Sequence, residues 1–89
     1  MLPRPPFKKA KDKILGKKYE LDLVFTDSKM MLRLNKTYRH KNETADVLSF
    51  SLSPQLGQIF INKKFTKNKK KLWALYLHGL AHLKGLHHG

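Results

Sequence analysis

The sequence predicts a small α+β domain, with helices on a mixed sheet and a last helix that carries metal-binding histidines. Two segments alternate apolar and polar residues with the period of a strand, and a third is a short apolar run between turn residues. Two other segments repeat apolar residues with the period of a helix. The 89 residues suffice for one domain. The predicted element order is β-α-β-β-α.

Residues 1–17 differ in composition from the rest of the chain. They are polar and basic, and prolines stand at positions 3, 5 and 6. Proline disfavours the interior of a regular element. The segment is therefore predicted to be a basic N-terminal arm or extension, and residues 18–89 are predicted to form the single domain.

The first strand and helix are predicted within residues 18–38. Residues 18–26 predict a half-buried strand, because Tyr19, Leu21, Leu23 and Phe25 alternate with mostly polar neighbours. The next residues, 26–28, are Thr, Asp and Ser, which are preferred N-caps. A helix is predicted from there to about Tyr38, with an apolar face of Met31, Leu34 and Tyr38.

The second half predicts two more strands and a long helix. Residues 46–52 alternate again, and residues 58–62 form the short apolar run. From about 67 to 84 the chain lacks proline and carries a broad apolar stripe, which predicts a helix capped by Thr66 and ended by Gly85. Five aromatic residues fall at core-facing spacing and are expected to pack rather than to stack on bases: Tyr38, Phe50, Phe60, Trp73 and Tyr76.

The charge balance predicts a polyanionic partner. Nineteen Lys and Arg stand against six Asp and Glu, a formal net charge of +13. Such a field favours nucleic acid as the partner. The densest cluster is predicted to bind the RNA backbone without sequence preference: Lys63, Lys64, Lys67, Lys69, Lys70 and Lys71. The sequence shows no transmembrane run and no secretory leader, so no membrane partner and a cytoplasmic location are expected.

Three histidines near the end of the chain predict a metal site. His78 and His82 are four residues apart on the predicted helix, so their imidazoles project from one face. If Gly85 breaks the helix, His88 can reach the same ion. Three imidazoles suit one Zn²⁺ per chain and leave a fourth position open, as in catalytic zinc sites. Nickel and cobalt also bind imidazole and are the alternative ions. The absence of cysteine excludes thiolate ligands and disulfides.

The same histidine spacing occurs in metzincin proteases. There a glutamate that acts as the general base follows the first histidine. Here that position is Gly79, and the basic surface suits a polyanion better. A peptidase is therefore the weaker interpretation.

Three blocks of the sequence resemble the YbeY family, bacterial zinc-dependent endoribonucleases of ribosomal RNA maturation. The first is His78-Gly-x-x-His82-Leu-x-Gly-x-x-His88. The second runs from Leu34 through Arg39 to Phe50, and the third covers residues 56–61. The blocks occur in the family order.

The resemblance implies a zinc ion on the three histidines and cleavage of single-stranded RNA, above all small-subunit ribosomal RNA, with ribosomal proteins as further partners. It also implies that Arg39 lies beside the metal and is needed for activity. We expect Arg39 to hold a phosphate while zinc acts as a Lewis acid. The alternative is a zinc-stabilised RNA- or ribosome-binding module with little catalysis of its own.

Overall fold

The computed structural model describes the backbone of residues 6–87 and the side chains of residues 6–85. Its elements are α1 (Phe7–Leu15), β1 (Glu20–Thr26), α2 (Ser28–Arg39), β2 (Val47–Ser53), β3 (Leu56–Asn62), a 3-10 turn η1 (Lys63–Phe65) and α3 (Lys69–His87). The predicted α+β class is confirmed, and the two predicted helices and three predicted strands are all present. No helix in this described part of the chain has the length and apolar character needed to cross a bilayer.

The three strands form one mixed sheet with β3 in the centre, in the order β1-β3-β2. β1 runs parallel to β3, with Leu23 beside Ile59. β2 and β3 form an antiparallel hairpin, with Ser49 on the other side of Ile59. Within the described residues, β2 is therefore an edge strand with one side free of sheet pairing.

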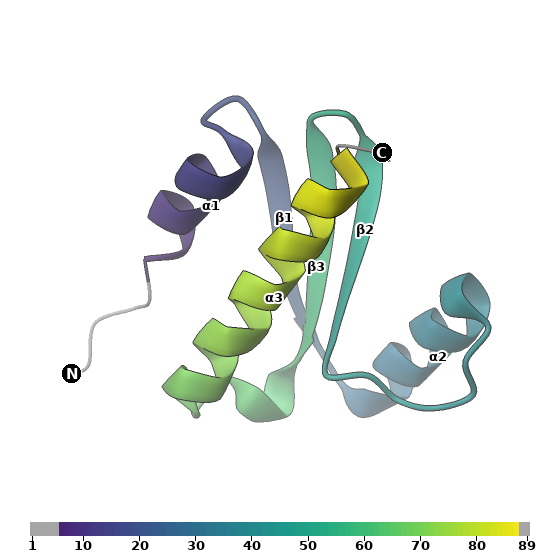
Figure 1. Cartoon of the computed structure of the whole chain (residues 1–89). Coiled ribbons are helices and arrows are strands. Elements are labelled where there is room, and N and C mark those ends of the chain that lie inside the picture. Colours follow the sequence, from purple (N-terminus) through teal and green to yellow (C-terminus); the bar gives the residue numbers. More distant parts are fainter. Residues whose placement is uncertain (1–5, 88–89) are drawn as a thin grey trace.

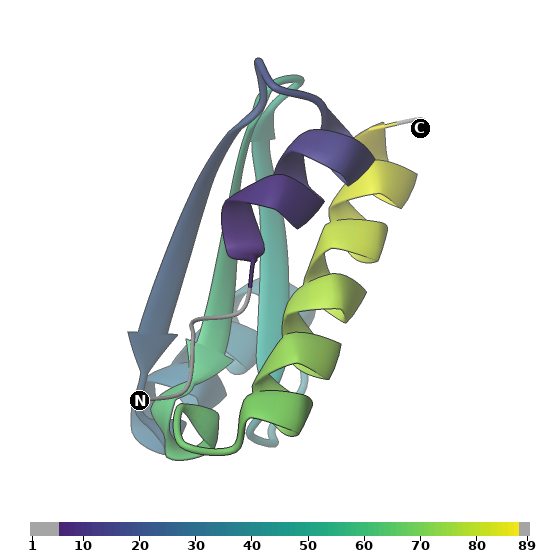
Figure 2. The same cartoon turned by 90° about the vertical axis from the view of Figure 1, so that its left-hand side faces the viewer.

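α3 crosses one face of the sheet, and α1 lies beside it on the same face (Figures 1 and 2). The core lies between α3 and the sheet, where Ile59, Ile61 and Leu80 have no solvent exposure. Side chains alternate across a strand, so Ile59 and Ile61 face α3 while Phe60 points to the opposite face. Burial of apolar side chains from both elements stabilises the two layers against each other.

Two glycines set how closely these layers approach. A Cβ atom added at Gly79 of α3 would lie 2.9 Å from Ile59 Cδ1 and 3.0 Å from Ser49 Oγ. A Cβ atom at Gly57 of β3 would overlap the Tyr19 hydroxyl and lie 3.1 Å from Leu83 Cδ2. The missing side chains leave room for α3 to lie directly on the hairpin.

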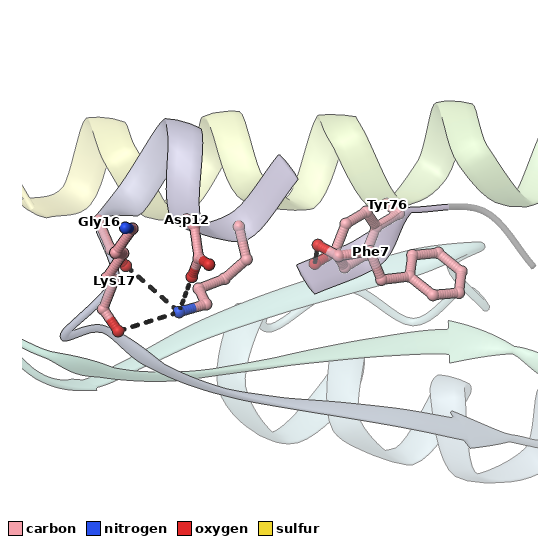
Figure 3. Close-up of polar contacts among 6 residues, drawn as sticks. Phe7, Asp12, Gly16, Lys17 and Tyr76 are labelled. Atoms are coloured by element: carbon pink, nitrogen blue, oxygen red, sulfur yellow. Dashed lines mark hydrogen bonds and ion pairs between the residues drawn. The ribbon is translucent and has the colours of Figure 1, made fainter. Parts of the chain in front are cut away.

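The N-terminal segment differs from the expected arm, because residues 7–15 form helix α1. Phe7, Ala10, Ile14 and Leu15 pack against the core. The Tyr76 hydroxyl donates a 2.7 Å hydrogen bond to the Phe7 carbonyl (Figure 3). Burial, with a smaller effect of the Asp12 carboxylate, raises the pKa of Tyr76 to about 12.

The other end of α1 is fixed by a buried lysine. The Lys11 ammonium donates to the carbonyls of Gly16 and Lys17, both at 3.3 Å, and pairs with the Asp12 carboxylate (Figure 3). The ammonium group thus provides hydrogen bonds to two carbonyl groups of the turn that leads into β1. The four apolar residues of α1 have helical spacing. The prolines and lysines of the segment nevertheless led to the prediction of an arm.

α2 begins as predicted, because Asp27 Oδ1 accepts a 2.8 Å hydrogen bond from the Met30 amide. Met31 is fully buried, and α2 covers part of the sheet face opposite α3. The expectation of a packed Tyr38 is wrong, since 64% of this residue is exposed. It lies one position before the end of α2, where the helix extends past the core.

Both predicted ends of α3 need correction. The N-cap is Asn68 rather than Thr66, because Asn68 Oδ1 accepts from the Lys71 amide at 3.1 Å. Thr66 instead donates its hydroxyl proton to the Lys63 carbonyl at 2.9 Å. Gly85 does not end the helix, which continues to His87. Glycine lowers helix propensity by about 1 kcal/mol, too little to terminate a helix whose apolar residues up to Leu83 are buried in the core.

We predict opposite effects of alanine at the two glycines of α3. Both variants gain about 1 kcal/mol of helix propensity. Gly85→Ala meets no described atom within 4 Å, so its free energy of unfolding should rise. Gly79→Ala overpacks the contact with Ile59, which typically costs about 1–3 kcal/mol, so its free energy of unfolding should fall. Urea unfolding followed by circular dichroism measures both, and a Gly79→Ala variant as stable as Gly85→Ala would contradict the close approach.

Candidate metal and phosphate site

A cleft of about 370 Å³ lies where the end of α2, the loop after it, the start of β2 and the middle of α3 meet. Elements far apart in the chain thus contribute to one concave surface. Its lining is mostly polar: Asn35, Arg39, Lys41, Glu43, Thr44, Ala45, Val47, Leu48, Ser49, His78 and His82.

Arg39 reaches the cleft because α2 ends directly after it. His40 adopts a left-handed backbone, with φ of 58°. The amides of His40 and Lys41 both donate to the Asn35 carbonyl, the second at 3.3 Å, and a left-handed residue of this kind commonly ends a helix. Arg39 is therefore the last helical residue, and its side chain extends past the free edge of β2.

The Arg39 guanidinium makes two contacts in the cleft. Nη2 donates to the Ser49 carbonyl at 3.3 Å and lies 3.1 Å from His82 Nε2. Arginine is always protonated and only donates, so His82 Nε2 is the acceptor. Arg39 Nε is buried and has no partner within the described residues. The side chain thus joins β2 to α3, and its buried Nε donor is left without a partner among the described residues.

Two residues that the sequence did not indicate hold this arrangement. Asn35 is only 3% exposed, and its Nδ2 donates to the Glu43 carbonyl at 2.8 Å, which fixes the loop after α2. Buried Ser49 donates its hydroxyl proton to the Gly79 carbonyl at 3.2 Å, which fixes β2 to α3. An asparagine in a helix and a serine in a strand carry no distinctive spacing, so only the fold reveals their roles.

The structure brings two of the three predicted ligands to the cleft. His78 and His82 both line it, one helical turn apart on α3; His78 is exposed and His82 half-buried. His88 lies outside the described residues. Among the residues that the structure describes, no group of three His, Cys, Asp or Glu side chains could hold one ion.

His82 has a perturbed protonation equilibrium. Burial lowers its pKa below the usual value, and the positive charges of Arg39 and His78 lower it further. The imidazole is therefore neutral at pH 7, the form that binds metals. In the neutral ring the nitrogen that accepts from Arg39 has no proton, so Nδ1 carries it. A metal ion at Nε2 would have to displace Arg39.

The predicted RNA-binding lysines gather at one end of the molecule rather than in the cleft. They lie on η1, the turn after it and the first residues of α3, and most are exposed. Lys71 is 3.7 Å from the Asp46 carboxylate, just before β2. Helical rise places Lys71 about 10 Å from His78 along α3. The lysine that lines the cleft itself is Lys41, which was not predicted.

We predict that His82 of the metal-free protein titrates below the value of about 6.5 for a free histidine. Because the unfolded chain binds the proton more readily, this group stabilises the fold above pH 6.5. The stabilisation is lost as the pH falls toward the folded-state pKa. Arg39→Ala should raise the pKa by removing a nearby positive charge. Histidine ring signals in NMR titrations measure both, and a pKa above that of free histidine would exclude this environment.

Comparisons with known proteins identify relatives of this chain. Residues 7–89 match the family model described as Endoribonuclease YbeY. A relative of that name from Pelagibacter ubique is 36% identical over 95 aligned positions, covering 88% of this chain and 62% of the relative. A second, from Campylobacter jejuni, is 38% identical and covers 83% and 65% respectively.

A third relative of the same name, from Nitratiruptor, is 40% identical over 81 positions, which cover 76% of this chain and 56% of the relative. The chain thus spans between 56% and 65% of the length of these relatives. The family model covers nearly all of the chain, including both histidines and the arginine of the cleft. The chain belongs to the YbeY family.

Proposed function

We propose that the protein is a metal-dependent endoribonuclease that cuts single-stranded RNA in the processing of small-subunit ribosomal RNA. The observation that carries the proposal is the placement of Arg39 against His82, 43 residues away in sequence, inside a polar cleft. Membership of a family whose relatives are named endoribonucleases supports RNA cleavage as the reaction. The net charge of +13 supports a polyanionic substrate.

Arg39 is proposed to bind the phosphate at the point of cleavage. A guanidinium presents two parallel N–H donors to a phosphate and stabilises the negative charge that develops on its oxygens. Its buried Nε donor lacks a partner in the described structure, which favours a rearrangement that gives the guanidinium an anionic partner. Ser49 and Asn35 act as positioning residues, because they fix the strand and the loop on either side of Arg39.

The residues present fit a zinc ion. His78 and His82 face one cleft, and the lowered pKa of His82 provides a neutral nitrogen donor at pH 7. We propose these two, with His88 as the third ligand. When bound, zinc would supply Lewis-acid stabilisation of the phosphate. Arg39 would leave His82 and turn toward the RNA.

The six lysines of η1, the turn after it and the first residues of α3 are proposed to guide the RNA backbone toward the cleft. Three of them occupy the first turn of α3, and no acidic residue accompanies them there. Positive charge at a helix N-terminus is unfavourable by about 0.3–1 kcal/mol for each residue. A bound phosphate backbone would offset this repulsion, so the arrangement suits a protein that works with RNA.

Zinc binding tests the ligand set independently of activity. His78→Ala and His82→Ala should each lower zinc affinity by more than the roughly 10–100-fold typical for loss of an outer-shell partner. Arg39→Ala should bind zinc at least as tightly as the unmodified chain, because it removes a competitor for His82 Nε2 and a positive charge. His40→Asn is the matched control, since asparagine tolerates the left-handed backbone. Isothermal calorimetry measures all four, and unchanged affinity in His82→Ala would exclude this site.

RNA cleavage tests the reaction. With a zinc-loaded chain and a precursor of small-subunit ribosomal RNA, Arg39→Ala should lose roughly 100-fold or more in rate while zinc content is retained. Arg33→Ala is the matched control, since Arg33 is exposed on the same helix and lines no part of the cleft. If all variants give equal trace cutting but still bind RNA, the protein is the zinc-stabilised binding module instead.

A further inference from the structure

A strip of aromatic side chains lies on the sheet face opposite α3. Tyr38 of α2, Phe50 of β2 and Phe60 of β3 form two edge-to-face pairs, with ring centroids 5.3 Å and 5.8 Å apart. Tyr38 and Leu52 expose 64% and 54% of their surface. We call Tyr38, Phe50 and Phe60 the aromatic strip. Large apolar groups that remain open to solvent in this way commonly mark a binding surface.

The aromatic strip lines a groove that continues into the candidate site. One cleft, of about 380 Å³, is lined by Leu34, Leu52, Gln58 and the aromatic strip. A second cleft is lined by Tyr38 and Phe50 together with Arg39 and His82. Since Tyr38 and Phe50 line both clefts, one surface leads from the arginine and histidine across the edge of β2 to the aromatic rings.

We propose that this groove binds unpaired nucleobases of the RNA, stacked on the aromatic strip next to the phosphate held by Arg39. This inference rests on the proposed function and adds a binding subsite to it. Every base has a π face, so aromatic side chains retain single strands largely independently of sequence. A duplex keeps its bases stacked on each other and could not use such a subsite.

The charges around the groove favour single-stranded RNA as the ligand over a second copy of the chain. Among the described residues no carboxylate lines either cleft, and the end that leads to the candidate site carries Arg39. An acidic position on the sheet, Asp22, pairs with Gln58 at the far side of the groove. Phosphates would therefore lie on the β2 side and bases over the rings. Two copies, each with a charge of +13, would repel one another.

Binding of a probe that cannot be cleaved tests the subsite separately from catalysis. The probe is a fluorescent single-stranded 2′-O-methyl oligonucleotide of about eight nucleotides, compared with an abasic oligomer of equal length and charge. Tyr38→Ala should weaken binding of the base-bearing probe by roughly 5- to 100-fold and leave the abasic probe unaffected. Tyr38→Phe keeps the ring and should stay within about twofold of the unmodified chain.

Phe25→Ala is the matched control, because Phe25 is 40% exposed and lines neither cleft. The proposal is overturned if Tyr38→Ala binds the base-bearing probe normally, or loses affinity for both probes equally. It is also overturned if sedimentation shows a dimer that Tyr38→Ala dissociates. Base-dependent binding without RNA cleavage would refute the proposed activity and leave this subsite intact. Cleavage without base-dependent binding would refute the subsite and leave the proposed activity intact.

Discussion

The contact between α3 and the β2–β3 hairpin determines where the functional side chains of the cleft lie. Gly79 allows the helix backbone to approach Ile59 and Ser49 closely, and the Ser49 hydroxyl then bonds the Gly79 carbonyl. This bond sits between the two histidines of α3 in sequence. The distance from His82 to the edge of β2, and so to Arg39, follows from that approach. A bulkier residue at position 79 would therefore disturb the site as well as the core.

Much of the fold could be predicted because its signals are local. Alternation indicated the strands, and the cap at Asp27 indicated the start of α2. The errors arose where tertiary packing outweighs local preference. α1 is short and basic, and its docking depends on partners such as Tyr76 that lie far along the chain. Gly85 has the chemistry of a helix stop, but α3 continues past it to His87.

The residues of the candidate site likewise differ in how far the sequence could predict them. The spacing of His78 and His82 is visible in the sequence, because both lie on one helix. The contact between Arg39 and His82 does not follow from spacing, since it depends on how α2 and α3 meet at β2, and only the family resemblance implied that Arg39 lies beside the histidines. Tyr38 shows the limit of periodicity: its spacing matches the apolar face of α2 and its ring contacts Phe50, yet 64% of the residue is exposed. Apolar spacing identifies the face of a helix that packs. It does not show how much of that face other residues cover.

The hydrogen bond from Arg39 to the Ser49 carbonyl also protects the sheet itself. β2 is an edge strand, and an unpaired edge can template the addition of another strand from a neighbouring molecule. Arg39 occupies one of the outward carbonyls of β2 and places a positive charge across that edge. A cation at a strand edge is a common natural defence against association between sheets. The same side chain thus opposes the addition of a strand from another copy of the chain along β2.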